Sequence, residues 1–142
     1  MQQKYHGSAG AGLLFICLED KTVLFAKRAK EDVMEPGTWG IPGGKKNKND
    51  NSSLYTAIRE TLEEFTTIPE INDIVKKVVY KDGYFKYTTY FCVISKKEKE
   101  EWNPDLNWEH EMVEWFPLSE LPDNLHFGLE HIKHKIKSLE TL

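Results

Sequence analysis

Cysteine is scarce in this chain of 142 residues, which contains only Cys17 and Cys92. Each of them lies inside an apolar run, and neither belongs to a pair with metal-ligand spacing. This scarcity argues against a disulfide-stapled secreted domain and against a cysteine-rich zinc site. We therefore expect two buried free thiols in a reducing compartment.

Long apolar runs and an excess of positive charge are missing as well. No apolar stretch reaches the roughly 18 residues that a membrane-spanning helix requires. The formal net charge is −4, which argues against a protein that holds nucleic acid through its overall field. The N-terminal segment has no basic region before its apolar run, so a first strand is favoured over a signal peptide. Together these absences predict a cytoplasmic protein.

Internal repeats, low-complexity segments and Ser/Gly linkers are also absent from the sequence. The length falls within the ~100–200 residues of an ordinary single domain. Apolar residues make up 39% and aromatic residues 12% of the chain, which is a globular composition. We expect a single domain over residues 1–142.

The first half of the chain begins with two strand patterns. Residues 10–18 are nearly all apolar, as in a strand buried on both faces, and residues 23–29 form its expected hairpin partner. Residues 30–51 are rich in Pro, Gly, Asn, Asp and Lys, which predicts a long irregular segment. A loop of this length inside a compact domain is typically functional.

A helix should follow, with Asn51, Ser52 and Ser53 offering N-cap side chains and Pro69 marking its end. Its apolar residues recur at helical spacing and form the stripe Leu54, Ala57, Ile58, Leu62 and Phe65.

The second half predicts a hairpin over residues 78–95 that turns at Asp82–Gly83. The charged residues 96–111 indicate a solvated loop, and residues 113–118 a further short strand. A last helix is predicted by the stripe Leu125, Leu129, Ile132, Ile136 and Leu139. This order of strands and helices predicts one layered α/β or α+β domain.

Three carboxylates stand close together on the first predicted helix. Glu60, Glu63 and Glu64 occupy positions i, i+3 and i+4, which places them on one face, opposite the apolar stripe. Their mutual repulsion is offset in part by Arg59 and would be offset far more by Mg²⁺ or Mn²⁺, whose preferred ligands are carboxylate oxygens. The alternative is a merely solvated helix face.

The loop before this helix favours the metal interpretation. Its Pro42-Gly43-Gly44 turn lets backbone approach a ligand closely and can offer a carbonyl oxygen to a hard metal. The lysines that follow, Lys45, Lys46 and Lys48, can meet phosphate oxygens. A phosphate bound through metal ions needs both signs of charge, and this segment supplies both.

The turn and the helix together resemble the Nudix box, the signature of the Nudix hydrolase family. The resemblance rests on Gly43–Gly44, on Arg59-Glu60-Thr61-Leu62-Glu63-Glu64 and on the Trp39-Gly40-Ile41-Pro42 lead-in, and it extends over about residues 8–121. Three departures make it a variant box. One extra residue lies in the Lys/Asn loop, the first Glu of the box falls on Asn51 or Asp50, and its final Gly falls on Thr66. The last departure implies a different turn after the helix.

The resemblance implies a Nudix-like α/β/α sandwich with a mixed sheet between helices, and it implies roles for site residues. Glu63 and Glu64, helped by the Gly43 carbonyl, would hold the divalent ions, while Glu60 would be a ligand or the base that deprotonates water. Arg59 would orient the glutamates. A further carboxylate is expected from the loop before the last strand, where Glu109 is preferred over Glu111.

Substrate contacts are less well marked. The candidates are Arg28, Trp39, Gly44, Lys45 and Tyr84, with Trp102 and Trp108 as alternative stacking residues. The other aromatic residues of 80–91 could stack a base, although alternation along a hairpin favours core packing. Three histidines of the last helix are interpreted as part of a solvated face, namely His126, His131 and His134.

By this resemblance the chain is expected to be a Mg²⁺- or Mn²⁺-dependent pyrophosphohydrolase that cleaves the diphosphate linkage of a nucleoside diphosphate-X substrate. A (d)NTP, an ADP-sugar and a dinucleoside polyphosphate all fit. Long RNA is disfavoured by the net charge, although a 5′-end RNA substrate stays open, as does the choice between monomer and homodimer. The alternative function is a catalytically inactive nucleotide-binding Nudix module.

Overall fold

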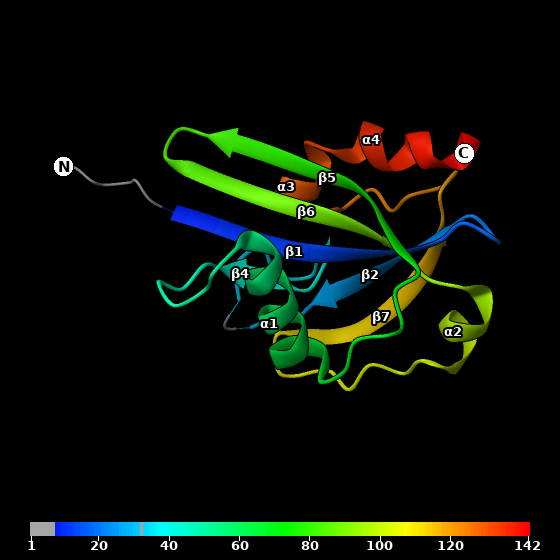
Figure 1. The fold of residues 1–142 in the computed structure, drawn as a ribbon, viewed down its shortest axis with the longest axis horizontal. Coiled ribbons are helices and arrows are strands. Elements are labelled where there is room, and N and C mark those ends of the chain that lie inside the picture. The colour runs from blue at the N-terminus through cyan, green and yellow to red at the C-terminus, as the bar shows by residue number, and fades with distance from the viewer. Residues whose placement is uncertain (1–7, 32) are drawn as a thin grey trace.

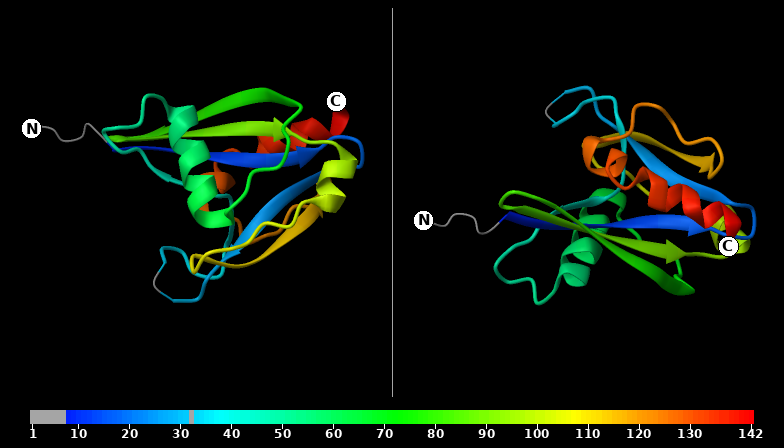
Figure 2. Two further views of the ribbon diagram at one scale, coloured as in Figure 1. Left: turned by 60° about the horizontal axis from the view of Figure 1, so that its bottom comes forward. Right: turned by 90° about the horizontal axis from the view of Figure 1, so that it is seen from above.

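The computed structural model describes residues 8–31 and 33–142 (Figure 1). Its elements, in chain order, are β1 (Ser8–Cys17), β2 (Thr22–Arg28), β3 (Trp39–Gly40), β4 (Gly43–Lys45), α1 (Ser53–Phe65), β5 (Asp73–Asp82), β6 (Phe85–Val93), α2 (Lys96–Glu101), β7 (His110–Pro117), α3 (Phe127–Glu130), α4 (Lys133–Lys137) and the 3₁₀ helix η1 (Ser138–Thr141). The seven strands form one sheet in the order β3-β2-β1-β6-β5, to which β4 adds on β1 and β7 on β2. Figure 2 shows α1 on one face of this sheet and α3 and α4 on the other. The predicted layered sandwich is confirmed.

Strand β1 lies at the centre of the sheet, parallel to β6 and antiparallel to β2 and β4. Its side chains alternate between two apolar cores: Leu13 and Phe15 belong to the core under α1, Leu14 and Ile16 to the core under α3 and α4. This is why the run reads as almost continuously apolar, as predicted for a strand buried on both faces. The antiparallel hairpin of β1 and β2 is also confirmed.

Helix α1 begins as predicted, with the Ser52 hydroxyl accepting a hydrogen bond from the Tyr55 amide at 3.0 Å. Its buried face is rotated relative to the predicted stripe. Leu62 is 46% exposed, whereas Glu64, expected on the solvated face, is 1% exposed. The helix packs on β1 and β4, so its buried face must include the side chain that faces the Pro-Gly-Gly turn.

The turn after α1 has a threonine where the box has glycine. Thr66 ends the helix with φ 71° and ψ −41°. Thr66 thus has a positive φ, which favours glycine, although its ψ lies outside the αL region in which glycine commonly ends a helix. Its amide donates to the Leu62 carbonyl at 3.0 Å, as a helix-ending residue should.

The hairpin of β5 and β6 turns at Asp82–Gly83 as predicted, with Gly83 at φ 60°. Two segments predicted as loops contain more structure than expected. Within residues 30–51, β3 pairs with β2 and β4 with β1. Within residues 96–111, the capped helix α2 forms, and Trp102 then packs edge-on against Phe15 at 5.1 Å between ring centroids. The charged composition of this segment concealed that packing.

The C-terminal stripe is buried as predicted, with all five of its residues below 9% exposure: Leu125, Leu129, Ile132, Ile136 and Leu139. The helix itself is interrupted at residues 131–132, which separate α3 from α4. Both cysteines are buried and free, as expected. Within residues 8–31 and 33–142, none of the helices is both long and apolar enough to span a membrane.

Candidate active site

Two of the three carboxylates of α1, Glu60 and Glu64, face the glycine turn. The Gly43 amide donates to Glu64 Oε2 at 3.3 Å. A Cβ atom on Gly44 would collide with the carboxylate carbon of Glu60, so only glycine lets that carboxylate approach. The turn and the helix are therefore built around each other.

Arg59 is the shared partner of the carboxylates. One of its terminal nitrogens, Nη1, donates to Glu60 Oε2 at 2.9 Å and to Glu63 Oε2 at 2.8 Å, while Nη2 donates to the Lys45 carbonyl at 3.1 Å. Charge-assisted bonds of this kind fix both glutamates relative to the turn.

Asp50 anchors Arg59 from the opposite side. Its carboxylate accepts from Arg59 Nε at 3.1 Å and Nη2 at 3.0 Å, and from the Thr56 hydroxyl at 2.8 Å. Its side chain is 2% exposed, and the bonds from Arg59 hold the pKa of Asp50 well below its usual range. Of the two residues aligned with the first Glu of the box, Asp50 therefore meets the arginine, whereas Asn51 is exposed.

Glu64 pairs with a histidine that the sequence did not single out. His110 Nε2 lies 2.6 Å from Glu64 Oε1, and both side chains are almost fully buried. Burial, reinforced by the charge of Glu109, raises the pKa of Glu64 to about 10. Burial, followed by the charge of Arg28, lowers the pKa of His110 to about 4. No local pattern marks His110, because the two residues lie 46 positions apart.

The donors around Glu64 suit a hard divalent cation. The charges of Glu60 and Glu109 both raise the pKa of Glu64, which means that this carboxyl lacks a compensating positive charge. Glu109 accepts from the Asn107 side-chain amide at 3.1 Å, whereas Glu111 pairs with Lys27 at 3.6 Å. As these side chains stand, bonded to Arg59 and His110, no three potential ligands among His, Cys, Asp and Glu converge as a preformed metal site in the described part of the chain.

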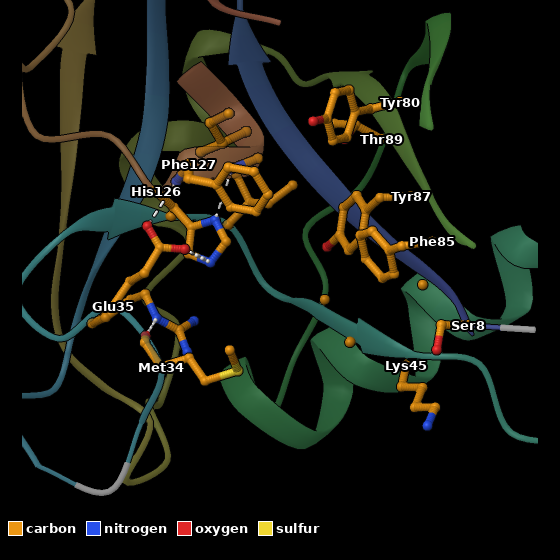
Figure 3. Close-up of a pocket in the computed structure, with 18 residues that line it drawn as sticks. Ser8, Met34, Glu35, Lys45, Tyr80, Phe85, Tyr87, Thr89, His126 and Phe127 are labelled. Atoms are coloured by element: carbon orange, nitrogen blue, oxygen red, sulfur yellow. Dashed lines mark hydrogen bonds and ion pairs between the residues drawn. The ribbon is translucent and has the colours of Figure 1, made fainter. Parts of the chain in front are cut away.

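A pocket of about 430 Å³ borders the same turn (Figure 3). Gly43, Gly44 and Lys45 form part of its wall. Aromatic side chains line it from two sides, Tyr80, Phe85 and Tyr87 on β5 and β6, and His126 and Phe127 at the start of α3. These three residues line the pocket, although Tyr87 also packs against the apolar core, so core packing alone does not account for the hairpin aromatics.

One wall of the pocket is fixed by Glu35. Its carboxylate accepts from His126 Nε2 at 3.1 Å and from the Phe127 amide at 2.9 Å. His126 Nδ1 accepts from the Gly128 amide at 3.2 Å, which places the ring proton on Nε2. His126 is thus part of the pocket and not of a solvated face. His131 and His134 are exposed, as predicted.

Of the predicted substrate contacts, Arg28, Gly44 and Lys45 line the pocket. Trp39 packs instead on Phe116 at 4.9 Å between centroids, inside the core. Tyr84 is 75% exposed at the β5–β6 turn and does not line the pocket.

The two alternative tryptophans do not line the pocket either. Trp102 belongs to the core under α1, and Trp108 is 66% exposed beside Glu109.

Arg28 lines the pocket, and its positive charge also acts on His110, the partner of Glu64. Its side chain crosses Gly40 beside His126, and its Nε donates to the Met34 carbonyl at 2.6 Å. The positive charge acts on both sides, since it contributes to lowering the pKa of His126 in the pocket wall and of His110 next to Glu64. A ligand that extends from the pocket to the carboxylates would pass this guanidinium.

Comparison with known proteins identifies the family of this chain. Residues 8–136 match the family model described as the NUDIX domain. A curated relative, the nucleoside triphosphate pyrophosphatase/Nudix hydrolase fusion protein of Bifidobacterium longum, is 30% identical over 128 residues. That match covers 85% of this chain but only 26% of the fusion protein, so the chain spans about a quarter of that relative's length.

Solved structures share the fold. The MutT NUDIX hydrolase of Burkholderia pseudomallei superposes with a TM-score of 0.66 at 22% identity, covering 93% of this chain and 96% of its own. A NUDIX hydrolase of Nitrosomonas europaea gives 0.73 at 22% identity, over 97% of this chain and 73% of its own. The NUDIX domain of Shewanella oneidensis NrtR, solved in complex with ADP ribose, gives 0.65 at 19% identity, over 92% of this chain and 86% of its own.

Proposed function

The chain belongs to the NUDIX domain family, and we propose that it is a Nudix-type hydrolase acting on phosphoric anhydride bonds. In this proposal it is a divalent-metal-dependent pyrophosphohydrolase that cleaves the diphosphate linkage of a small nucleoside diphosphate-X substrate. The proposal takes residues 1–142 as one domain working in the cytoplasm.

The observation that carries the proposal is the juxtaposition of the carboxylates with the pocket across one turn. Glu60 and Glu64 contact Gly44 and Gly43, and the same two glycines line the pocket. A nucleotide seated in the pocket would thus present its phosphates to the carboxylates. Pockets of ~300–1,000 Å³ are typical of small-molecule sites, and this one has the volume for a nucleoside.

The acidic residues would hold Mg²⁺ or Mn²⁺ through Glu63, Glu64, Glu109 and the Gly43 carbonyl, with Glu60 as a further ligand or as the base. Bound cations of this kind neutralise phosphate charge and lower the pKa of the attacking water. Arg59 holds Glu60 and Glu63 in place. The chain thereby supplies the negative charge that the metal needs and the orientation that the reaction needs.

On the substrate side, the aromatic walls of the pocket would stack the nucleobase. Arg28 and Lys45 supply positive charge to the phosphates at the border with the carboxylates. The catalytically inactive alternative keeps the same pocket without turnover, and the ADP-ribose complex of the NrtR domain is an example of ligand binding by this fold.

A nucleotide panel tests the proposal directly. Nucleoside triphosphates, ADP-ribose-like diphosphates, dinucleoside polyphosphates and 5′-triphosphorylated RNA are each incubated with Mg²⁺, with Mn²⁺ and with EDTA. We expect metal-dependent release of a nucleoside monophosphate together with pyrophosphate, phosphate or a sugar phosphate. Binding without any metal-dependent product would support the inactive module instead.

The Glu63→Gln variant tests the assignment of the acidic residues. Its side chain is 53% exposed, so the fold should persist while turnover falls about a thousandfold, the consequence of losing several kcal/mol of charge stabilisation. Glu120→Gln, an equally conservative change at an exposed carboxylate away from the site, is the matched control. Wild-type turnover by Glu63→Gln would remove Glu63 from the metal-binding set.

A further inference from the structure

The ring of Tyr87 on β6 packs against the apolar core under α3 and α4 and over three glycines, a position that we call the glycine seat. A Cβ atom on Gly10 would lie 3.0 Å from Tyr87 Cδ1, and one on Gly12 would lie 2.5 Å from its hydroxyl oxygen. A Cβ on Gly43 would come closer still to the same hydroxyl. Three residues on two strands must therefore lack a side chain for this ring to lie where it does.

None of the hydrogen bonds found among residues 8–31 and 33–142 involves the Tyr87 hydroxyl, and Tyr87 lines the pocket. Burial raises the pKa of the phenol, and the charges of Glu64 and Glu60 raise it further. The group is thus protonated at any physiological pH. It is a donor that lacks an acceptor, at a place where neutral packing would have been served by phenylalanine.

The position of the hydroxyl is the boundary between the pocket and the carboxylates. Tyr87 and Gly43 both line the pocket, and Figure 3 shows the Tyr87 ring beside Phe85, across from His126. Gly43 separates the hydroxyl from Glu64, which accepts from the amide of the same glycine. A nucleotide reaching from the pocket to the carboxylates would place its first phosphate at this boundary.

We infer that Tyr87 is a substrate-contacting residue, whose hydroxyl donates a hydrogen bond to a phosphate oxygen of the nucleotide seated in the pocket. The inference rests on the proposed function, because it requires a nucleotide in this pocket. It adds a contact that the pattern of the box does not specify. A purely structural ring would instead fill the glycine seat equally well without its hydroxyl.

The test uses Tyr87→Phe, which keeps the ring in its seat and removes only the donor. Affinities are measured calorimetrically for the 5′-monophosphate that the wild type releases fastest and for the corresponding nucleoside. In the variant we expect the monophosphate to bind about tenfold or more weakly, as befits a hydrogen bond to a charged group. The nucleoside should bind as it does to the wild type, kcat/KM should fall in parallel with monophosphate affinity, and the melting temperature should not change.

Several outcomes would overturn the inference. Equal affinities of variant and wild type for both ligands would assign the ring a packing role, and an equal loss for both ligands would assign the hydroxyl to the nucleoside. Tyr55→Phe, which removes an exposed phenol on the outer side of α1, should change neither affinity and serves as the matched control. A wild type that binds no nucleotide would overturn the proposed function and this inference together, whereas an active wild type with an equally active Tyr87→Phe would overturn the inference alone.

Discussion

The two faces of the sheet bury different kinds of side chain. Under α4 the core is apolar, as shown by Leu14, Ile16 and Ile136, each fully buried. Under α1 the buried residues include ionisable side chains, Glu64 and His110, whose burial is as complete as that of the leucines. In the described part of the chain, the buried ionisable side chains Asp50, Glu64 and His110 gather around α1.

The difference between the two faces locates a cost in folding free energy at the buried carboxylate of Glu64. A buried carboxylate whose charge is not compensated costs several kcal/mol in the folded state, and burial accordingly raises the pKa of Glu64 beside His110. Perturbed groups of this kind concentrate at functional sites. The buried cluster around Ile136 under α4 is apolar, and we expect it to contribute to stability and not to chemistry.

Replacement of Glu64 by glutamine should separate its effect on turnover from its effect on stability most clearly. Glutamine has the same shape, can accept from the Gly43 amide and is neutral, as Glu64 is near pH 7 when its pKa is about 10. We expect turnover with Mg²⁺ to fall about a thousandfold or more, while the melting temperature stays constant or rises. Both are measured on one preparation, by product release and by calorimetry.

An active Glu64→Gln enzyme would show that this carboxyl does not take part in metal binding. A variant that is inactive only because it unfolds would show that Glu64 is a structural residue after all.

The opposite result is expected on the other face. Ile136→Ala removes a fully buried side chain under α4, which should lower the free energy of unfolding by about 2–5 kcal/mol. Turnover per folded molecule should stay within twofold of wild type, roughly, because Ile136 does not line the pocket. Urea titration gives the first quantity and initial rates well below the melting temperature give the second.

The conservative change Ile136→Val should cost only about 0.5–1.5 kcal/mol. A large loss of turnover in Ile136→Ala at full folding would mean that the two faces are coupled, contrary to the comparison above.

The pH dependence of stability tests the contribution of the Asp50–Arg59 ion pair on the α1 side of the sheet. Its folded pKa lies below its ordinary value because Arg59 stabilises the carboxylate. A depressed pKa contributes stability at all pH values above the unfolded pKa of about 4, and the contribution declines as pH falls below that value. Asp50→Asn should therefore lower the melting temperature at pH 7, and the gap from wild type should narrow steadily between pH 5 and pH 3, roughly. Parallel melting curves over that range would show that the ion pair contributes nothing to stability.

Much of this fold could be predicted because local periodicity encodes it. The doubly buried β1, the turn at Gly83 and the C-terminal apolar stripe are all short-range patterns. The acidic residues on α1 were identified by their spacing, and the resemblance to the Nudix box supplied their roles. These features need no knowledge of which distant segments meet.

The residues that sequence reasoning missed are those brought together by the tertiary structure. His110 reaches Glu64 from β7, and Glu35 reaches His126 over about twice that separation in sequence. Helical spacing also could not tell which of two adjacent faces of α1 is buried, so Leu62 was expected inside and Glu64 outside. Local composition predicts neither a contact between distant segments nor a helix rotation of this size.

The smallest expected effect concerns the end of α1, where the polar face meets its turn. Thr66 holds φ 71°, which a β-branched residue adopts only under strain of roughly 1–3 kcal/mol. Its hydroxyl donates to the Asp105 carbonyl at 2.7 Å, which returns about 0.5–1.5 kcal/mol. Thr66→Gly relieves the strain and loses the bond, so we expect a net stabilisation of less than about 1 kcal/mol with unchanged turnover. Thr66→Ala loses the bond and keeps an unfavourable φ, so it should lower the free energy of unfolding. If urea titration shows that the alanine variant is as stable as the glycine variant, backbone strain at this turn does not distinguish threonine from the glycine of the box.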